Sequence, residues 1–212
     1  MRRTIYFLFT AVITVAGAAK ADESTERLDK AAKIFKTMTS SKNGIPGAKL
    51  SASDCIAVIP GFKKGAAVVG VGFGKGFIVC RQAGGWSAPG AITIESTSLG
   101  LQIGGEEMDL VMLSMDREKR PKLLSDRFTI GADASAAWGN GKSAHEDPST
   151  RIYFYGQTKG AFAGFGLDGA TLKPDTSADK TLYGREISNL DVIEEGHTTP
   201  AGAGSFMAAL PQ

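Results

Sequence analysis

The stretch that most constrains the fold is residues 70 to 77, which read GVGFGKGF. Glycine stands at every second position, and a period of two is the period of a β-strand, whose neighbouring side chains point to opposite faces. One face of this strand is bare glycine, while the other carries Val71, Phe73, Lys75 and Phe77. A bare face indicates a close approach to the strand, either by another part of the fold or by a ligand in a groove.

A lysine among glycines also suggests a phosphate-binding loop, but the spacing excludes one. A Walker-type loop needs a glycine five positions before its Gly-Lys pair and a Ser or Thr directly after it. With Gly74 and Lys75 as the pair, those positions hold Val69 and Gly76. The dinucleotide fingerprint fails as well, because Phe77 stands where its third glycine is needed.

The first residues have the three parts of a secretory signal peptide. Arg2 and Arg3 precede an apolar run over residues 5 to 16, and Ala-Lys-Ala at 19 to 21 forms a small-x-small cleavage site. The run is too short for a membrane span. We therefore expect cleavage after residue 21 and a periplasmic or secreted mature chain. Because Asp22 and not Cys follows the cut, a lipid anchor is not expected.

The expected mature chain is nearly neutral. Without residues 1–21 it carries 21 basic and 22 acidic side chains. Nucleic-acid binding proteins rely on a surplus of Lys and Arg, so this balance argues against that class. The length suits one domain, which we place at residues 22–193, followed by a Gly/Ala/Thr-rich tail at 194–212.

Both cysteines, Cys55 and Cys80, lie in expected strands. In an oxidising compartment two such residues can pair, and closing a loop of this size would stabilise the fold by roughly 3 kcal/mol. The alternative is two buried free thiols. A metal site is disfavoured because no histidine lies nearby.

Residues 24 to 40 have the 3.6-residue period of an amphipathic helix. Its charged side chains nearly balance, whereas helices that lie on membranes are usually strongly basic. Packing on the domain is therefore favoured, and packing on a membrane surface is the alternative.

Short β-like runs follow this helix. They cover residues 55–59, 66–80, 91–96, 99–103, 108–115, 127–138, 151–156 and 161–167. One short helix is expected at about 117–126, and polar loops at 139–150 and 173–182. The pattern predicts an α+β fold with a mostly antiparallel sheet, sandwich- or barrel-like, plus an N-terminal amphipathic helix and one short internal helix.

Catalytic residues are sparse. A nucleophile elbow needs the motif Gly-x-Ser-x-Gly. Around Ser87 the chain has Pro89 where the second glycine of this motif is required. The two histidines, His145 and His197, lie in polar loop contexts typical of surface residues. We therefore expect no enzyme, no cofactor and no metal, with a hydrolase that uses Ser87 and a histidine as a minor alternative.

Short motifs recur in a fixed order between about Arg27 and Leu190. They are AVIP at 57–60, KKG at 63–65, Arg81, GWSAP at 85–89, GLQIG at 100–104, Asp109, GAD at 131–133, GAFAG at 160–164 and YG at 183–184. As an ordered set they resemble the SYLF domain family. Two positions depart from the family pattern: residues 139–142 read GNGK without the usual proline and arginine, and Asp179 stands where Asn is usual.

The resemblance implies binding rather than catalysis, because eukaryotic relatives associate with phosphoinositide membranes and with actin. We expect a non-catalytic, exported module that recognises anionic lipid head groups at an envelope surface. The residues expected to bind lipid cluster around the glycine strand and are Lys63, Lys64, Lys75, Arg81 and Trp86. Alternatively, these lysines only solubilise strand ends, Trp86 is a core residue, and the module binds a protein partner without lipid affinity.

Overall fold

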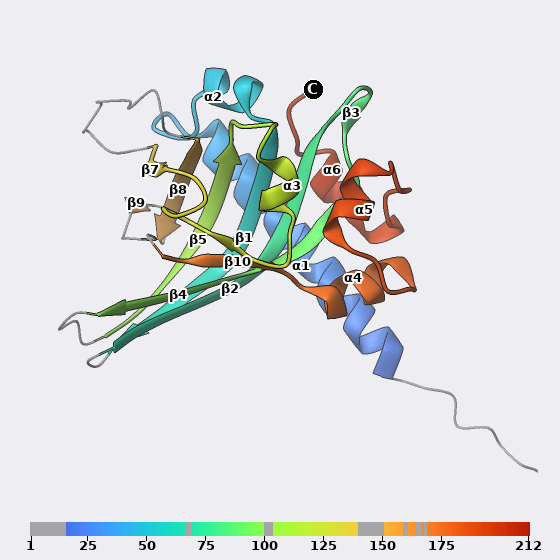
Figure 1. Ribbon diagram of the computed structural model, residues 1–212, viewed down its shortest axis with the longest axis horizontal. Helices are drawn as coiled ribbons and strands as arrows, with labels where there is room; N and C mark the ends of the chain where they lie inside the picture. Colours follow the sequence, from blue (N-terminus) through green and yellow to red (C-terminus); the bar gives the residue numbers. More distant parts are fainter. Residues whose placement is uncertain are drawn as a thin grey trace, which may run out of the picture.

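The computed structural model describes residues 16–66, 69–99, 104–139, 151–158, 161–163, 167 and 169–212 (Figure 1). The strands are β1 (Cys55–Ala66), β2 (Val69–Gln82), β3 (Gly85–Trp86), β4 (Gly90–Leu99), β5 (Gly104–Ser114), β6 (Phe128–Thr129), β7 (Ala136–Trp138), β8 (Ile152–Thr158), β9 (Ala161–Ala163) and β10 (Thr171–Pro174). The helices are α1 (Ala16–Ser40), α2 (Gly47–Ala52), α3 (Arg120–Leu123), α4 (Thr176–Tyr183), α5 (Asn189–Glu194), the 3-10 turn η1 (Ala201–Ala203) and α6 (Gly204–Met207).

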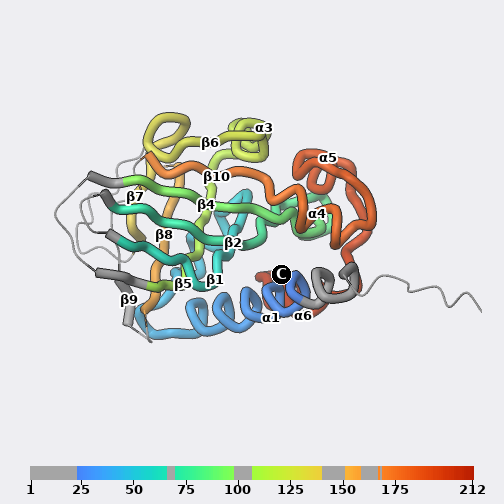
Figure 2. The backbone as a smooth tube through the Cα atoms, turned by 90° about the horizontal axis from the view of Figure 1, so that it is seen from below, coloured from blue at the N-terminus to red at the C-terminus, as the bar shows by residue number. Residues whose placement is uncertain are grey.

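The strands form one curled sheet in the spatial order β6-β10-β4-β2-β1-β5-β8-β7, with β3 beside β2 and β9 beside β8. Among the described strands, all pairs are antiparallel except β7 with β8. Helices α1 and α6 run along the convex face, and α3 lies on the opposite, concave side (Figure 2). The predicted α+β class, with a mostly antiparallel sheet and an N-terminal helix, is confirmed.

Alternation along the central strands divides the interior into two cores. Ile59, Phe62 and Leu110 face the concave core, which α3 and α5 close. Phe77 and Val79 face the convex core beneath α1 and α6. One sheet therefore has apolar side chains on both faces along most of its length.

Helix α1 packs on the domain, as its near-balanced charge favoured. Leu28, Phe35 and Met38 are buried against the convex face of the sheet, and burying each large apolar side chain contributes roughly 1.5–3 kcal/mol. The helix begins at Ala16, so the predicted cleavage point lies within it. Of the helices in the described ranges, none is long and apolar enough to cross a membrane.

The glycine alternation falls on β2, and close packing explains it. A Cβ atom added at Gly72 would lie 2.5 Å from Phe62 Cζ, and one at Gly76 would lie 2.1 Å from the Val58 carbonyl oxygen. Both distances are far below van der Waals contact. The bare face is therefore filled by the neighbouring strand β1 and by the ring of Phe62, not by a ligand.

The predicted disulfide is present. Cys55 and Cys80 are bonded, and they face each other directly across β1 and β2. The bond lies in the concave core, where both residues are fully buried.

Several stretches differ from the sequence-based expectation, and two of them have a clear local cause. Residues 127–138 form the short strands β6 and β7 instead of one strand, because Gly131, with φ of +86°, turns the chain between them. Residues 173–182, expected to be a loop, contain the end of β10 and most of α4. The Asp175 side chain accepts a hydrogen bond from the Ala178 N–H at the start of this helix, and Gly184 ends it in the left-handed conformation.

The C-terminal segment after residue 193 packs on the domain. Ala203, Phe206 and Leu210 are buried in the convex core beside α1. Phe206 lies with its ring centroid 6.4 Å from that of Phe77.

Candidate functional site

The five residues predicted to bind lipid lie on β1, β2 and β3 but on different surfaces. Lys63 and Lys75 point to the convex side, whereas Lys64 alternates with Lys63 and points to the concave side. Arg81 and Trp86 lie at the other end of β2. The structure therefore brings together only Arg81 and Trp86, while the three lysines lie apart from this pair.

Arg81 and Trp86 contact each other, with the guanidinium carbon 4.4 Å from the ring centroid. Arg81 Nε donates to the Ser53 carbonyl at 3.0 Å, and Trp86 Nε1 donates to the Pro211 carbonyl at 2.7 Å. Arg81 thus ties the end of α2 to β2, and Trp86 ties the C-terminal segment to β3. The pair of Arg81 and Trp86 therefore has a structural role.

The two convex-side lysines have carboxylate partners. Lys75 Nζ lies 2.8 Å from Asp175 Oδ2, and Lys63 Nζ lies 3.9 Å from Glu107 Oε2. The Lys63–Glu107 pair is exposed on both sides and contributes at most about 1 kcal/mol to stability, whereas the Asp175 carboxylate that pairs with Lys75 is buried. The consequence of both pairs here is electrostatic, because each carboxylate offsets the positive charge that an anionic surface would attract.

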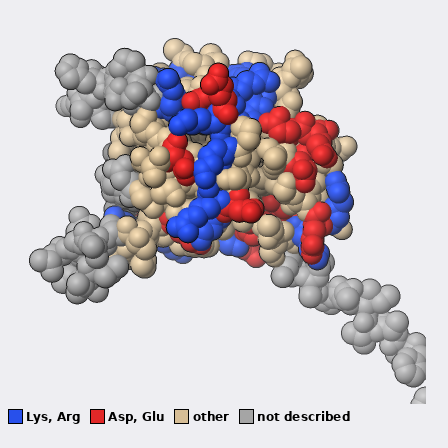
Figure 3. Space-filling view, viewed as in Figure 1, with Lys and Arg blue, Asp and Glu red and all other residues tan. Residues whose placement is uncertain are grey.

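The concave side of the molecule also carries charges of both signs. Figure 3 shows Lys and Arg gathered in a band over α3, with Asp and Glu inside and beside it. In and next to α3, Arg117, Lys119 and Lys122 are exposed together with Glu118 and Asp126. This face is therefore mixed in charge and not uniformly basic.

No helix in the described ranges covers the convex face where the central strands extend past α1 (Figure 2). On β2, Phe77 is fully buried, but Phe73 is 47% exposed and Val71 58% exposed. Across the sheet, Phe73 is flanked in register by Lys63 on β1 and Glu95 on β4, and Lys63 is flanked by Glu107 on β5. We call this surface, formed by Lys63, Val71, Phe73, Glu95 and Glu107, the tip face.

A groove lies between α1 and the tip face. Its volume is about 490 Å³, and it is lined by Lys30, Lys33 and Ile34 of α1, Pro60, Gly61 and Lys63 of β1, and Glu107 and Asp109 of β5. We call it the α1 groove. It carries three lysines and two carboxylates, so it too is mixed in charge.

The floor of the α1 groove is shaped by an irregularity in β1. The pairing registers of β1 with β2 and β5 shift around Pro60 and Gly61, and Gly61 has φ of +58°. The Gly61 N–H donates to Asp109 Oδ1 at 2.9 Å, which replaces a lost ladder bond. Burial raises the pKa of Asp109, and the nearby Glu107 adds to that effect.

A second polar group is buried between β4 and the C-terminal helices. Asp179 Oδ1 accepts the Ala91 N–H at 2.7 Å, and Asn189 Nδ2 donates to the Ala91 carbonyl at 2.9 Å. Asp179 Oδ2 and the amide oxygen Oδ1 of Asn189 are buried without a hydrogen-bond partner among the described residues. Burial raises the pKa of Asp179 to about 7, and burial likewise raises that of Tyr183.

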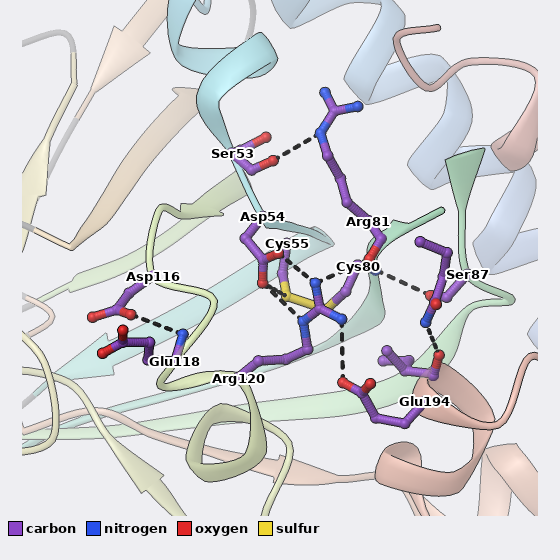
Figure 4. Close-up of polar contacts among 12 residues, drawn as sticks. Ser53, Asp54, Cys55, Cys80, Arg81, Ser87, Asp116, Glu118, Arg120 and Glu194 are labelled. Carbon is purple, nitrogen blue, oxygen red and sulfur yellow. Dashed lines mark hydrogen bonds and ion pairs between the residues drawn. A yellow bond between two sulfur atoms is a disulfide. The ribbon is translucent and has the colours of Figure 1, made fainter. Parts of the chain in front are cut away.

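Arg120 forms a buried ion pair that the sequence did not reveal. Its guanidinium donates two hydrogen bonds to the Asp54 carboxylate, one at 2.8 Å, and further bonds to Glu194 Oε1 at 3.2 Å and to the Arg81 carbonyl at 2.9 Å. Figure 4 shows this network beside the disulfide. The Asp54 carboxylate raises the pKa of Arg120, which is only 2% exposed. No local pattern predicts the pair, because 66 positions separate its partners.

The residues of the hydrolase alternative are engaged elsewhere or lie outside the described ranges. Ser87 is buried; its Oγ accepts the Cys80 N–H and donates to the Ala88 carbonyl, both at 3.0 Å. His197 lies beside Glu195 and Arg185, and His145 falls outside the described residues. Nothing in this geometry supports a hydrolase.

Comparison with known proteins identifies the family. Residues 95–212 match the family described as "Ysc84: Las17-binding protein actin regulator". The chain belongs to the Ysc84 family. This confirms the resemblance to SYLF domains drawn from the motifs, since the two names denote the same domain.

The curated relatives are longer proteins. SH3 domain-containing YSC84-like protein 1 of Xenopus laevis is 35% identical over 74% of this chain and 50% of its own length, and that of Homo sapiens is 31% identical over 82% and 54%. Protein YSC84 of Saccharomyces cerevisiae is 27% identical over 78% and 37%. The chain thus spans about half the length of its vertebrate relatives. No solved structure matches it.

Proposed function

We propose that this Ysc84-family chain is a non-catalytic protein-binding module and that the tip face contacts its partner. The observation that carries the proposal is the exposure of Val71 and Phe73 on a sheet face framed by Lys63, Glu95 and Glu107. Adjacent large apolar side chains with a polar rim are typical of interaction surfaces. Charges of both signs in the rim suit a protein partner, whose own surface carries both signs.

The first partner to test is the actin filament. The family description names actin regulation and Las17 binding, and the chain shares most of its length with these relatives. The relatives' additional length means that their full activity need not reside in this part, so the transfer to this chain is part of the proposal.

Anionic lipid is the second candidate. Lys30, Lys33 and Lys63 converge on the α1 groove beside Phe73, and lysines near an anionic surface contribute about 1 kcal/mol each. Glu107 and Asp109 in the same groove oppose this attraction. We therefore rank lipid below protein as the ligand.

Co-sedimentation separates the two candidates. The chain is spun with actin filaments, with neutral vesicles and with anionic vesicles over a salt series, beside the Phe73→Glu variant. Leu190→Glu is the matched control, because Leu190 is exposed on α5 away from the tip face. The proposal is supported if the wild type and Leu190→Glu pellet with filaments and Phe73→Glu does not. Pelleting only with anionic vesicles, fading with salt, assigns lipid, and no pelleting overturns both candidates.

Export by the predicted signal peptide belongs to the same proposal. Mass spectrometry of the protein purified from its native source is expected to give an N-terminus at Asp22. An intact N-terminal segment would overturn the predicted cleavage.

A further inference from the structure

The tip face and the α1 groove lie side by side on the convex side of the sheet. Lys63 belongs to both surfaces, because it pairs across the strands with Phe73 and also lines the groove. The groove has apolar side chains, Ile34 and Pro60, in its lining. The molecule therefore presents an exposed aromatic ring beside a hollow that contains apolar surface.

We propose that this face binds a second copy of the same chain, with Phe73 of each copy seated in the α1 groove of the other. The inference rests on the proposed function, namely that the tip face contacts protein. A two-fold contact uses the same patch on both copies, so the patch must be complementary to itself. A projection and a hollow at adjacent positions satisfy this condition, because a two-fold axis between them places each projection over the partner's hollow.

The charges around the two features are also complementary. Glu95, which pairs with Lys173 at 2.5 Å and remains about half exposed, stands next to Phe73 on β4. Lys33 stands with Lys30 on the α1 side of the groove. When Phe73 of one copy lies in the α1 groove of the other, Glu95 beside the ring approaches Lys30 and Lys33 beside that groove. Lys63 lies near the axis, and the adjacent Glu107 offsets the repulsion between the two copies of this lysine.

The groove is large enough for an aromatic ring. Its volume of about 490 Å³ falls within the range of roughly 300–1,000 Å³ that is typical of small-ligand pockets. A phenylalanine ring therefore enters with space left for the stems of the flanking lysines, which cover apolar surface while their ammonium groups stay in water.

A second copy of the chain fits this face better than a partner whose surface carries charge of one sign, and better than a partner whose surface is apolar. An anionic partner would be attracted by Lys30 and Lys33 but repelled by Glu95 and Glu107. An apolar partner would strip water from these carboxylates without replacing their hydrogen bonds, which is costly. A copy of the same face presents acidic side chains toward these lysines and lysines toward these acidic side chains.

Sedimentation velocity tests the proposal on the chain alone, over roughly 1 to 300 µM, where modest protein interfaces associate. The wild type is expected to shift from one to two chains with concentration. Phe73→Glu is expected to weaken association about 30-fold or more, as for a central apolar anchor. Leu190→Glu is expected to associate as the wild type does, and circular dichroism confirms that both variants are folded.

A charge exchange tests the arrangement itself. Glu95→Lys and Lys33→Glu are each expected to weaken association roughly threefold to tenfold, and the two changes in one chain are expected to restore it. A wild type that stays monomeric throughout, a Phe73→Glu variant that still dimerises, or a double variant without recovery each overturns the proposal.

The outcome is separable from that of the proposed function, since neither actin nor vesicles are present. A monomeric chain that pellets with filaments overturns the dimer alone. A dimer that does not pellet overturns the filament partner alone.

Discussion

The base and the tip of the sheet are made of the same strands but differ in what covers them. At the base, α1 and α6 bury Phe77 completely, and four positions along the same face of β2, Phe73 is 47% exposed. The base also buries an ion pair, Arg120 with Asp54, whereas the tip pair of Lys63 with Glu107 is open to solvent. The alternation of side chains is the same in both regions, so the covering helix and not the strand decides the role of each.

The covered base carries the stabilising contacts, and the open tip is the surface at which we propose that a partner binds. Removing a group from a covered region leaves a cavity or an unpaired charge, while a change on an open face alters mainly what can bind there.

Arg120→Leu is expected to lower the free energy of unfolding by about 3–5 kcal/mol, because it leaves the Asp54 carboxylate buried without its partner. Urea unfolding measures the change. Lys119→Ala, at the neighbouring exposed position, is the control and is expected to leave the midpoint unchanged. If Arg120→Leu lowers the free energy of unfolding by no more than the loss of an exposed ion pair does, the base of the sheet does not have the stabilising role described.

Asp179→Asn is expected to remove part of the pH dependence of stability. The folded state raises the pKa of Asp179 from 3.8 to about 7, so it keeps a proton that the unfolded chain releases. The stability contributed by this carboxyl is complete below about pH 4 and is lost as the pH rises to about 7, which corresponds to roughly 4 kcal/mol.

The measurement is the free energy of unfolding of wild type and variant at acidic and neutral pH. The advantage of the amide variant is expected to grow as the pH rises through this window. If the free energies of unfolding of wild type and variant instead change in parallel with pH, Asp179 is ionised in the folded protein throughout this pH window. The amide is also the residue usual at this position in the family that the motifs indicated.

Gly76→Ala is expected to destabilise the fold by about 1–3 kcal/mol, the usual cost of overpacking, because the added Cβ would meet the backbone of Val58. Gly65→Ala is the matched control on the neighbouring strand, where a Cβ meets nothing within 4 Å. Thermal unfolding of both variants is the measurement. Equal losses would mean that the glycines act only through strand propensity.

Phe73→Glu is expected to change the free energy of unfolding by at most about 0.5 kcal/mol, as is usual for surface substitutions, while abolishing association through the tip face. Chemical denaturation reports the first quantity, and the binding assays described above report the second. A large loss of stability would show that the tip belongs to the folding core.

Much of this division could be predicted from the sequence, and its limits have physical causes. The glycine strand, the helix at 24–40 and the pairing of Cys55 with Cys80 follow from local periodicity and compartment chemistry. Helices α2, α4 and α5 were missed because each is too short for a 3.6-residue period to show, although Asp175 and Gly184 mark the ends of α4.

The remaining features depend on segments far apart in the chain. Alternation treats Phe73 and Phe77 alike, and only the path of α1 decides which of them is covered. The α1 groove combines α1, β1 and β5, so spacing within one segment cannot place its lysines beside its carboxylates. The buried pair of Arg120 with Asp54 was unpredictable for the same reason.

The bond between Cys55 and Cys80 has a further consequence for the hairpin that carries the tip face. It joins the two strands at the end opposite the tip, so both arms of the hairpin are held in one covalent loop. A protease that cuts once anywhere between the two cysteines releases no fragment, and the pieces separate on a gel only after reduction. The hairpin that carries Val71 and Phe73 can therefore be nicked without being shed.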